Sequence, residues 1–207
     1  MALIFGSNLG TTIDGTVLAD RIFARGGNDT VNALAGADFV AAGDGNDTVN
    51  AGLGDDVVLG GNGRDTLNLG AGNDIGFGGD GRDELFGNAG NDLLFGGDGL
   101  DHLAGGLGQD YLTGGAGRDF FDYSSLLDSR PGVDNRDHIQ DFQHRVDKID
   151  LSDLNLDRVG RDRDHVYVTH AGGDTFLNVD TAGDIRPEFV VQLEGNVNLT
   201  VRADVIL

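Results

Sequence analysis

A nine-residue period runs through the middle of this 207-residue chain and limits its fold more than any other feature. Eleven aspartates follow one another at intervals of nine: Asp29, Asp38, Asp47, Asp56, Asp65, Asp74, Asp83, Asp92, Asp101, Asp110 and Asp119. Glycine stands two residues before each of them, and an apolar residue stands two residues after all but one, Gly76 being the exception. Self-similarity at a short fixed period is the signature of a solenoid.

The period has a direct structural interpretation. Nine residues divide into a tight turn of about six and a strand of about three, with glycine where the turn needs φ > 0 or packs against its neighbour. The apolar residue is the middle of the strand and points inward. One unit cannot bury this side chain alone, but stacked units bury a continuous core. We therefore expect an all-β solenoid in which two units make one coil and unit n lies over unit n+2.

This stacking lines up turn carboxylates and backbone carbonyls in rows. Calcium accepts about six to eight such oxygens in forgiving geometry, whereas magnesium requires a strict octahedron. Zinc and copper favour His or Cys ligands, and the chain has no Cys. Eleven units make nine n/n+2 pairs, so the sequence predicts up to about nine Ca²⁺ ions. The predicted ligands are the eleven aspartate side chains and backbone carbonyls of Gly61, Gly63, Gly79, Gly81, Gly97, Gly99, Gly106 and Gly108.

The charge agrees with a cation-binding chain. The formal net charge is -21, and only three of the 35 acidic residues are Glu. A surface this acidic argues against nucleic acid as a partner, because phosphate binding needs basic side chains. It also destabilises a compact state through self-repulsion, which bound cations would offset.

The units have the form GGxGxDxUx, where U is large and apolar. Clear examples are GGNGRDTLN (60–68), GGDGRDELF (78–86) and GGDGLDHLA (96–104). They resemble the RTX, or hemolysin-type calcium-binding, repeat, and this resemblance implies a right-handed parallel β-roll loaded with calcium. Units between 24 and 59 carry Ala at the first position, so we expect weaker sites there. At Gly76 the inward position is empty, and we expect Ile75 or Phe77 to fill it.

The chain divides into three parts by composition. Residues 1–23 form an N-terminal segment with one degenerate unit, and residues 24–122 hold the eleven repeats. Residues 123–207 lose the period and contain short alternating segments typical of strands, so we expect a β-rich cap over the open end of the solenoid. The expected strands lie near 138–142, 147–152, 165–170, 174–180, 188–193 and 197–201.

A second resemblance concerns the segment DHIQDFQHRVDKIDLSDLN, residues 137–155. It is similar to the segment after the repeats in serralysin-type metalloproteases and in the R-modules of mannuronan epimerases. The last four residues, Asp204, Val205, Ile206 and Leu207, resemble the uncleaved C-terminal secretion signal of that group. The resemblance implies type I secretion machinery as a partner, an extracellular location, and folding on calcium outside the cell. A final β-strand is the alternative interpretation of the tail.

No catalytic motif is present. The chain lacks HExxH and GxSxG, and its five histidines are scattered. No run approaches the roughly 18 apolar residues of a membrane span. We therefore expect a non-catalytic structural or interaction role. The alternative is a module that binds an anionic polysaccharide such as alginate and assists an epimerase or another enzyme, with Arg64, Arg82 and Arg118 aligned on one side of the roll.

Three phenylalanines need a separate explanation. Phe77, Phe86 and Phe95 occupy the ninth position of successive units, which should point outward. The n/n+2 stacking places Phe77 and Phe95 on one face and Phe86 on the other. Two interpretations stay open: terminal segments cover these rings, or the rings form an exposed patch for a partner or for self-association.

Overall fold

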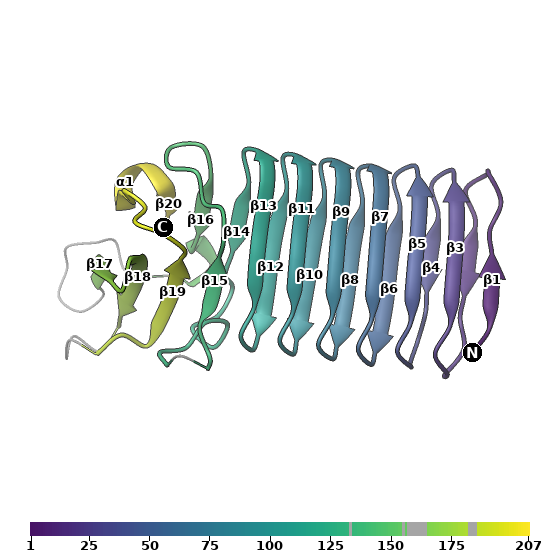
Figure 1. Cartoon of the computed structure of the whole chain (residues 1–207), viewed down its shortest axis with the longest axis horizontal. Helices are drawn as coiled ribbons and strands as arrows, with labels where there is room; N and C mark the ends of the chain where they lie inside the picture. The colour runs from purple at the N-terminus through teal and green to yellow at the C-terminus, as the bar shows by residue number, and fades with distance from the viewer. Residues whose placement is uncertain (133, 155, 157–164, 182–185) are drawn as a thin grey trace.

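The computed structural model describes residues 1–132, 134–154, 156, 165–181 and 186–207. Two long sheets face each other and build a straight roll, with the two ends of the chain at opposite ends of it (Figure 1). Sheet A contains, in spatial order, β1 (Leu3–Phe5), β3 (Arg21–Gly26), β5 (Phe39–Asp44), β7 (Val57–Gly63), β9 (Ile75–Gly81), β11 (Leu93–Gly99), β13 (Tyr111–Gly117), β15 (Asp137–Ile139), β19 (Phe189–Leu193), β18 (Asp174–Asp180) and β17 (His165–Ala171). Sheet B contains β2 (Thr12–Asp14), β4 (Thr30–Asn32), β6 (Thr48–Leu53), β8 (Thr66–Ala71), β10 (Glu84–Ala89), β12 (His102–Leu107), β14 (Phe120–Asp122), β16 (Lys148–Asp150) and β20 (Val205–Ile206).

The strand register confirms the predicted stacking. Neighbouring repeat strands are parallel, and each residue pairs with the one 18 positions away, as Leu67 does with Leu85 and Leu85 with Leu103. The inward apolar residues therefore stack in two columns, one from each sheet. They are completely buried from Ile22 through Phe121. The chain folds as the expected all-β parallel roll.

Glycine at the fourth position of each unit meets both expected requirements. All eleven of these glycines have positive φ, from 94° at Gly27 to 155° at Gly99. A Cβ at Gly81 would also overlap the carbonyl oxygen of Gly63 in the turn below. At the second position three units carry another residue, and Arg25, Leu34 and Asn88 hold positive φ there. Of the three, only Asn adopts this conformation readily.

The structure corrects the expectation for Gly76. Neither Ile75 nor Phe77 turns inward: the first is partly buried and the second is exposed on the outer face of sheet A. The space is filled by Leu69, which stands where most later units have a first glycine. Leu69 is fully buried, and its Cδ1 lies 3.0 Å from the place that a Cβ on Gly76 would take.

Because Leu69 fills the space at Gly76, we expect two substitutions that are each destabilising to compensate for one another when they are combined. Leu69→Gly should destabilise the calcium-loaded protein by about 3–5 kcal/mol, because it leaves a cavity. Gly76→Leu should cost about 1–3 kcal/mol by overpacking against Leu69. The double variant restores the regular pattern and should be at least about 2 kcal/mol more stable than the sum of the single effects. Denaturant unfolding of the four proteins gives the coupling, and additive effects would contradict the packing argument.

The C-terminal part continues both sheets before it changes character. β15 and β16 pair in parallel with the last repeat strands, and β19, β18 and β17 then extend sheet A in antiparallel order. A short 3-10 helix, η1 (Ser152–Leu154), follows β16. Five of the six expected strands are present, although with shifted ends. No described helix is long and apolar enough to cross a membrane.

The prediction of a strand at 197–201 is wrong. A helical turn, α1 (Val201–Asp204), begins inside this range, and residues 196–200 form no strand. The reason is local hydrogen bonding: Asp204 Oδ2 accepts from the Thr200 backbone N–H (2.7 Å) and from its hydroxyl (3.0 Å). Side chains that bond their own backbone compete with ladder formation.

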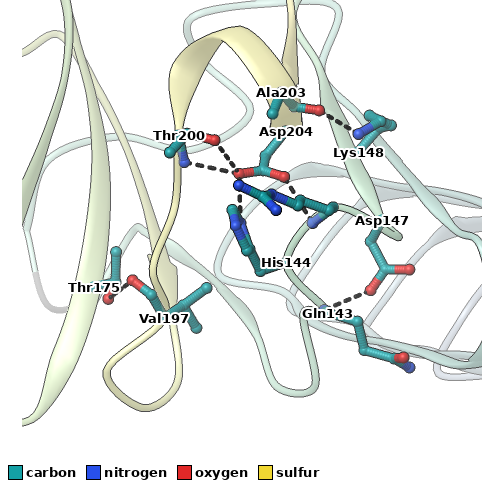
Figure 2. Close-up of polar contacts among 10 residues, drawn as sticks. Gln143, His144, Asp147, Lys148, Thr175, Val197, Thr200, Ala203 and Asp204 are labelled. Atoms are coloured by element: carbon teal, nitrogen blue, oxygen red, sulfur yellow. Dashed lines mark hydrogen bonds and ion pairs between the residues drawn. The ribbon is translucent and has the colours of Figure 1, made fainter.

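The tail is held by the same aspartate, as Figure 2 shows. Asp204 is fully buried and also accepts from the Arg145 backbone N–H (2.8 Å), and it lies 2.9 Å from His144 Nδ1. Lys148 donates to the carbonyl of Ala203. Burial opposes the charged form of Asp204, but the donors from Thr200, Arg145 and His144 lower its pKa, so the carboxylate is the favoured form. β20 then completes the edge of sheet B beside β16.

Candidate metal centre

The repeat aspartates form two continuous rows inside the roll, one at each edge where the chain passes between the sheets. From Asp38 to Asp119, each Oδ1 accepts the backbone N–H of the aspartate 18 residues earlier, at 2.6–3.0 Å, and Asp29 Oδ1 accepts that of Thr11 at 2.7 Å. The first row contains Asp20, Asp38, Asp56, Asp74, Asp92 and Asp110. The second row contains Asp29, Asp47, Asp65, Asp83, Asp101 and Asp119. All twelve residues are at most 2% exposed.

The second carboxylate oxygen behaves differently in the repeats and at the ends of the rows. In all eleven repeat aspartates, Oδ2 is buried and has no hydrogen-bond partner. At Asp20, by contrast, Oδ2 accepts from the backbone N–H (2.7 Å) and hydroxyl (2.8 Å) of Thr16. An unpartnered buried carboxylate oxygen is strongly unfavourable, so these eleven atoms are the ones that need a positive partner.

Burial and repulsion between carboxylates raise the pKa of the repeat aspartates from Asp38 to Asp119. Desolvation is the larger cause, and neighbouring carboxylates of the same row add to it. The pKa is raised to about 7 at Asp56, Asp65, Asp92 and Asp110, and to about 6 at Asp101 and Asp119. At the strand spacing of about 4.8 Å and an effective dielectric constant of about 20, two ionised neighbours repel by roughly 3 kcal/mol. None of the described ion pairs involves a row aspartate.

Glycine at the first position makes room for this oxygen. In units that begin with glycine, a Cβ on that glycine would lie within 3 Å of Oδ2 of the aspartate five residues later; Gly60, Gly78, Gly87, Gly96, Gly105 and Gly114 share this arrangement. In the units from 24 to 59 the residue is a buried alanine, yet Asp29, Asp38, Asp47 and Asp56 keep the same unpartnered Oδ2. Weaker sites in those units stay a prediction.

The donor set fits a hard divalent cation. No three carboxylate or imidazole side chains converge on one point among the described residues, so a bound ion would have to take several ligands from the main chain. The stacked turns offer backbone carbonyls at this place, because glycines such as Gly63 and Gly81 let successive turns pack in direct contact. Carboxylate plus carbonyl oxygens in flexible turns are typical calcium ligands.

Two aspartates beyond the repeats join the rows, and the nine-residue period alone did not reveal them. Asp137 Oδ1 accepts from the Asp110 N–H (2.9 Å), and Asp147 Oδ1 accepts from the Asp119 N–H (3.1 Å). Asp137 Oδ2 is again buried; burial raises the pKa of this carboxylate, and the buried Tyr123 hydroxyl interacts with it. Asp147 Oδ2 accepts from the Gln143 N–H (2.7 Å). The signal was available, since each is followed at the second position by an apolar residue, as in the repeats.

Asp141, in the segment after the repeats, makes a different contact at the same junction. Its carboxylate accepts the backbone N–H groups of Gly114 (2.9 Å) and Gly115 (2.8 Å), which belong to the last repeat. Both oxygens are therefore occupied by main-chain donors. Residues 137–147 thus join the C-terminal part to the roll by continuing the rows and by closing the last turn.

The arginines proposed for polysaccharide binding do not form an open basic groove. Arg64 makes an ion pair with Glu84 at 2.7 Å, and the Arg118 guanidinium lies over the ring of Phe120, 5.2 Å from its centroid. The same edge of the roll also carries exposed acids, Asp44 and Asp80 among them. The arginines thus lie within a mixed and mainly acidic edge.

Comparison with solved structures finds several similar chains. Among solved structures, the AlgE6R3 subunit of the Azotobacter vinelandii mannuronan C5-epimerase is 22% identical with a TM-score of 0.37, over 97% of this chain and 80% of that chain. The AlgE6R2 subunit of that enzyme is 29% identical with a TM-score of 0.40, over 74% and 88%. The extracellular lipase LipA of Serratia marcescens is 17% identical with a TM-score of 0.24, over 99% of this chain but only 40% of the lipase.

A protein-family model also matches most of the chain. The family described as Peptidase M10 serralysin C terminal matches residues 21–207, which include the repeats, the junction segment and the tail. This is the group that the segment after the repeats resembled in the sequence. The chain therefore belongs to the serralysin C-terminal family of the M10 peptidases.

Proposed function

We propose that this chain is a secreted calcium-binding protein that folds when it meets calcium outside the cell and has a non-catalytic structural or interaction role. One observation carries the proposal: eleven buried carboxylate oxygens, arranged in two rows, have no partner within the protein. Calcium binding by the β-rolls of this family supports the choice of ion. The proposed ligands are the repeat aspartates, with Asp137 added, and the glycine carbonyls of the stacked turns.

The two rows explain why folding would depend on the ion. Without cations, the folded chain must bury two rows of closely spaced carboxylates, and a glycine-rich acidic chain has little else to offset this cost. Binding free energy then becomes folding free energy, because the ligands converge only when the turns stack. Extracellular calcium modules work at about 10⁻⁴–10⁻³ M, a range suited to folding outside the cell and not inside it.

A calcium titration followed by far-UV circular dichroism tests the proposal. The chain is first freed of metal with a chelator and then titrated with calcium, with magnesium as the control ion. A cooperative change from coil to β structure at about millimolar calcium or below, absent with magnesium, is the expected result. A chain that is already folded in chelator and does not respond to calcium would show that the aspartate rows serve another purpose.

The proposed export rests on the C-terminal tail. Asp204–Leu207 resemble a secretion signal, but in the folded protein Asp204 and Val205 are buried. The signal would therefore be read before the cap forms, on an unfolded chain. Co-expression with type I export machinery should secrete the full chain and retain a chain that lacks residues 204–207. Equal export of both chains would assign the tail to the fold alone.

A further inference from the structure

The two outer faces of the roll differ sharply in polarity. On sheet A, the side chains that point outward from β1 to β13 are mostly large and apolar: Leu3, Phe5, Phe23, Phe39, Val57, Leu59, Ile75, Phe77, Leu93, Phe95 and Tyr111. The other outward positions before the turns hold Arg21, Ala41 and Thr113, and none of these positions holds a carboxylate. Arg25 lies over the ring of Phe5, and the exposed Asp44, Asp80 and Asp98 lie near the C-terminal ends of β5, β9 and β11. We call the outward side chains before the turns the apolar face. It carries no carboxylate itself and has acidic residues along one margin.

Sheet B presents more polar side chains at the equivalent positions. Asn32, Asn50 and Asn68 form a ladder of side-chain hydrogen bonds at 3.0 and 3.2 Å, which begins at Asp14 (2.8 Å). Threonines from Thr12 to Thr66 occupy the neighbouring row. Farther along, Glu84, His102, Asp122, Lys148 and Asp150 share the face with Phe86, Ala104 and Phe120. The outer face of sheet B is therefore polar over its first half and mixed over its second, whereas the outer face of sheet A is mainly apolar; the repeat consensus fixes neither.

No described segment covers the apolar face. β1 and β2 lie at one end of the roll and the cap lies at the other (Figure 1). Phe77 keeps 36% of its surface exposed and stacks on Phe95 with ring centroids 4.9 Å apart and planes 8° from parallel. Phe5 stacks in the same way on Phe23, at 5.5 Å. The described terminal segments therefore do not cover Phe77 and Phe95, and the interpretation as an exposed patch remains.

We propose that the apolar face is a self-association surface, on which a second copy of this chain packs sheet A against sheet A. Seven strands at about 4.8 Å spacing make the face about 30 Å long, and its partly exposed apolar side chains sum to several hundred Å². A standard interface buries about 800 Å² on each partner, so the face and its margins reach the lower part of that range.

A second copy fits the face in both shape and charge. The calcium ions of the proposed function would offset most of the net charge of -21, and two apolar faces that meet leave their acidic residues at the margin of the interface. A two-fold axis brings the same patch of both copies together, and two sheets can pack face to face at about 10 Å with aligned strands. The stacked rings are already ordered in one chain, so little side-chain entropy is lost on association.

The test is the mass of the calcium-loaded protein by sedimentation or light scattering over a concentration series. The wild-type chain should approach twice 21.6 kDa, and Phe77→Ser with Phe95→Ser should raise the dissociation constant at least tenfold while circular dichroism stays unchanged. Phe86→Ser, on sheet B, is the matched control and should dimerise like the wild type. A folded wild-type protein that stays monomeric throughout would overturn the proposal, whatever the calcium dependence of folding.

The face itself can be identified because the chain has no cysteine. Ala41→Cys on sheet A and Asn50→Cys on sheet B provide single sites for a spin label in the same half of the roll. Packing of sheet A on sheet A predicts a short inter-copy distance for the Ala41→Cys variant and a much longer one for Asn50→Cys. A dimer with the reverse order would use sheet B and would refute the assignment.

Discussion

Asp83→Asn is expected to change stability with opposite signs in calcium and in chelator. Asparagine can still accept the Asp65 N–H bond, which Asp83 Oδ1 accepts at 2.8 Å, but it replaces the unpartnered Oδ2 with a neutral amide nitrogen. In calcium, the loss of a charged ligand should cost about 2–4 kcal/mol. In chelator, the loss of one buried charge between Asp65 and Asp101 should stabilise the folded chain by about 1–3 kcal/mol.

Asp80→Asn is the matched control, because Asp80 lies in the same turn but is exposed. It should leave both states within about 0.5 kcal/mol of the wild type. The measurements are denaturant unfolding in saturating calcium and, for the metal-free chain, the pH at which circular dichroism detects refolding. If Asp83→Asn destabilises the protein equally with and without calcium, Asp83 has only a structural role.

In chelator, lowering the pH from 8 to 5 is expected to fold the metal-free chain. Burial raises the pKa of Asp56, Asp65, Asp92 and Asp110 to about 7 in the folded state, against 3.8 for an ordinary aspartate. Protonation therefore favours the folded chain: this stabilisation is complete below pH 3.8 and is lost as the pH rises through about 7. Each such group contributes up to about 1.4 kcal/mol per pH unit, so several together give a steep dependence.

Calcium should reverse this dependence. The ion needs ionised carboxylates, so protons compete with it, and the calcium concentration at the folding midpoint should rise as the pH falls below about 7. Circular dichroism on a grid of pH and calcium concentration measures both trends, with magnesium as the control ion. A metal-free chain that is equally structured at pH 5 and pH 8 would show that the rows do not control folding.

The sequence could predict what repeats. A contact between residues 18 positions apart is the same contact in every coil. The positions of the strands, the two inward columns between Ile22 and Phe121 and the two aspartate rows therefore all follow from one nine-residue unit. Glycine at the fourth position was equally predictable, because a turn that overlaps its neighbour at any Cβ admits no other residue. The period also separated Phe77 and Phe95 from Phe86.

Contacts that occur once could not be obtained in this way. Leu69 fills the space at Gly76 from a different strand, because its side chain in β8 reaches the empty position in β9, and no local rule chooses it over Ile75 or Phe77. The rows continue through Asp137 and Asp147 at separations of 27 and 28 residues, which differ from the 18 residues of every repeat coil.

The tail shows the same division. Its apolar alternation favoured a strand at 197–201. Instead, Asp204 accepts hydrogen bonds from Thr200, four residues earlier, and from His144 and Arg145, which are distant in the chain. The sequence by itself thus determined the roll and the rows of carboxylates, because periodic side chains create identical neighbours in every coil. Only the tertiary structure decided how the roll ends, because there each side chain meets partners that the period does not supply.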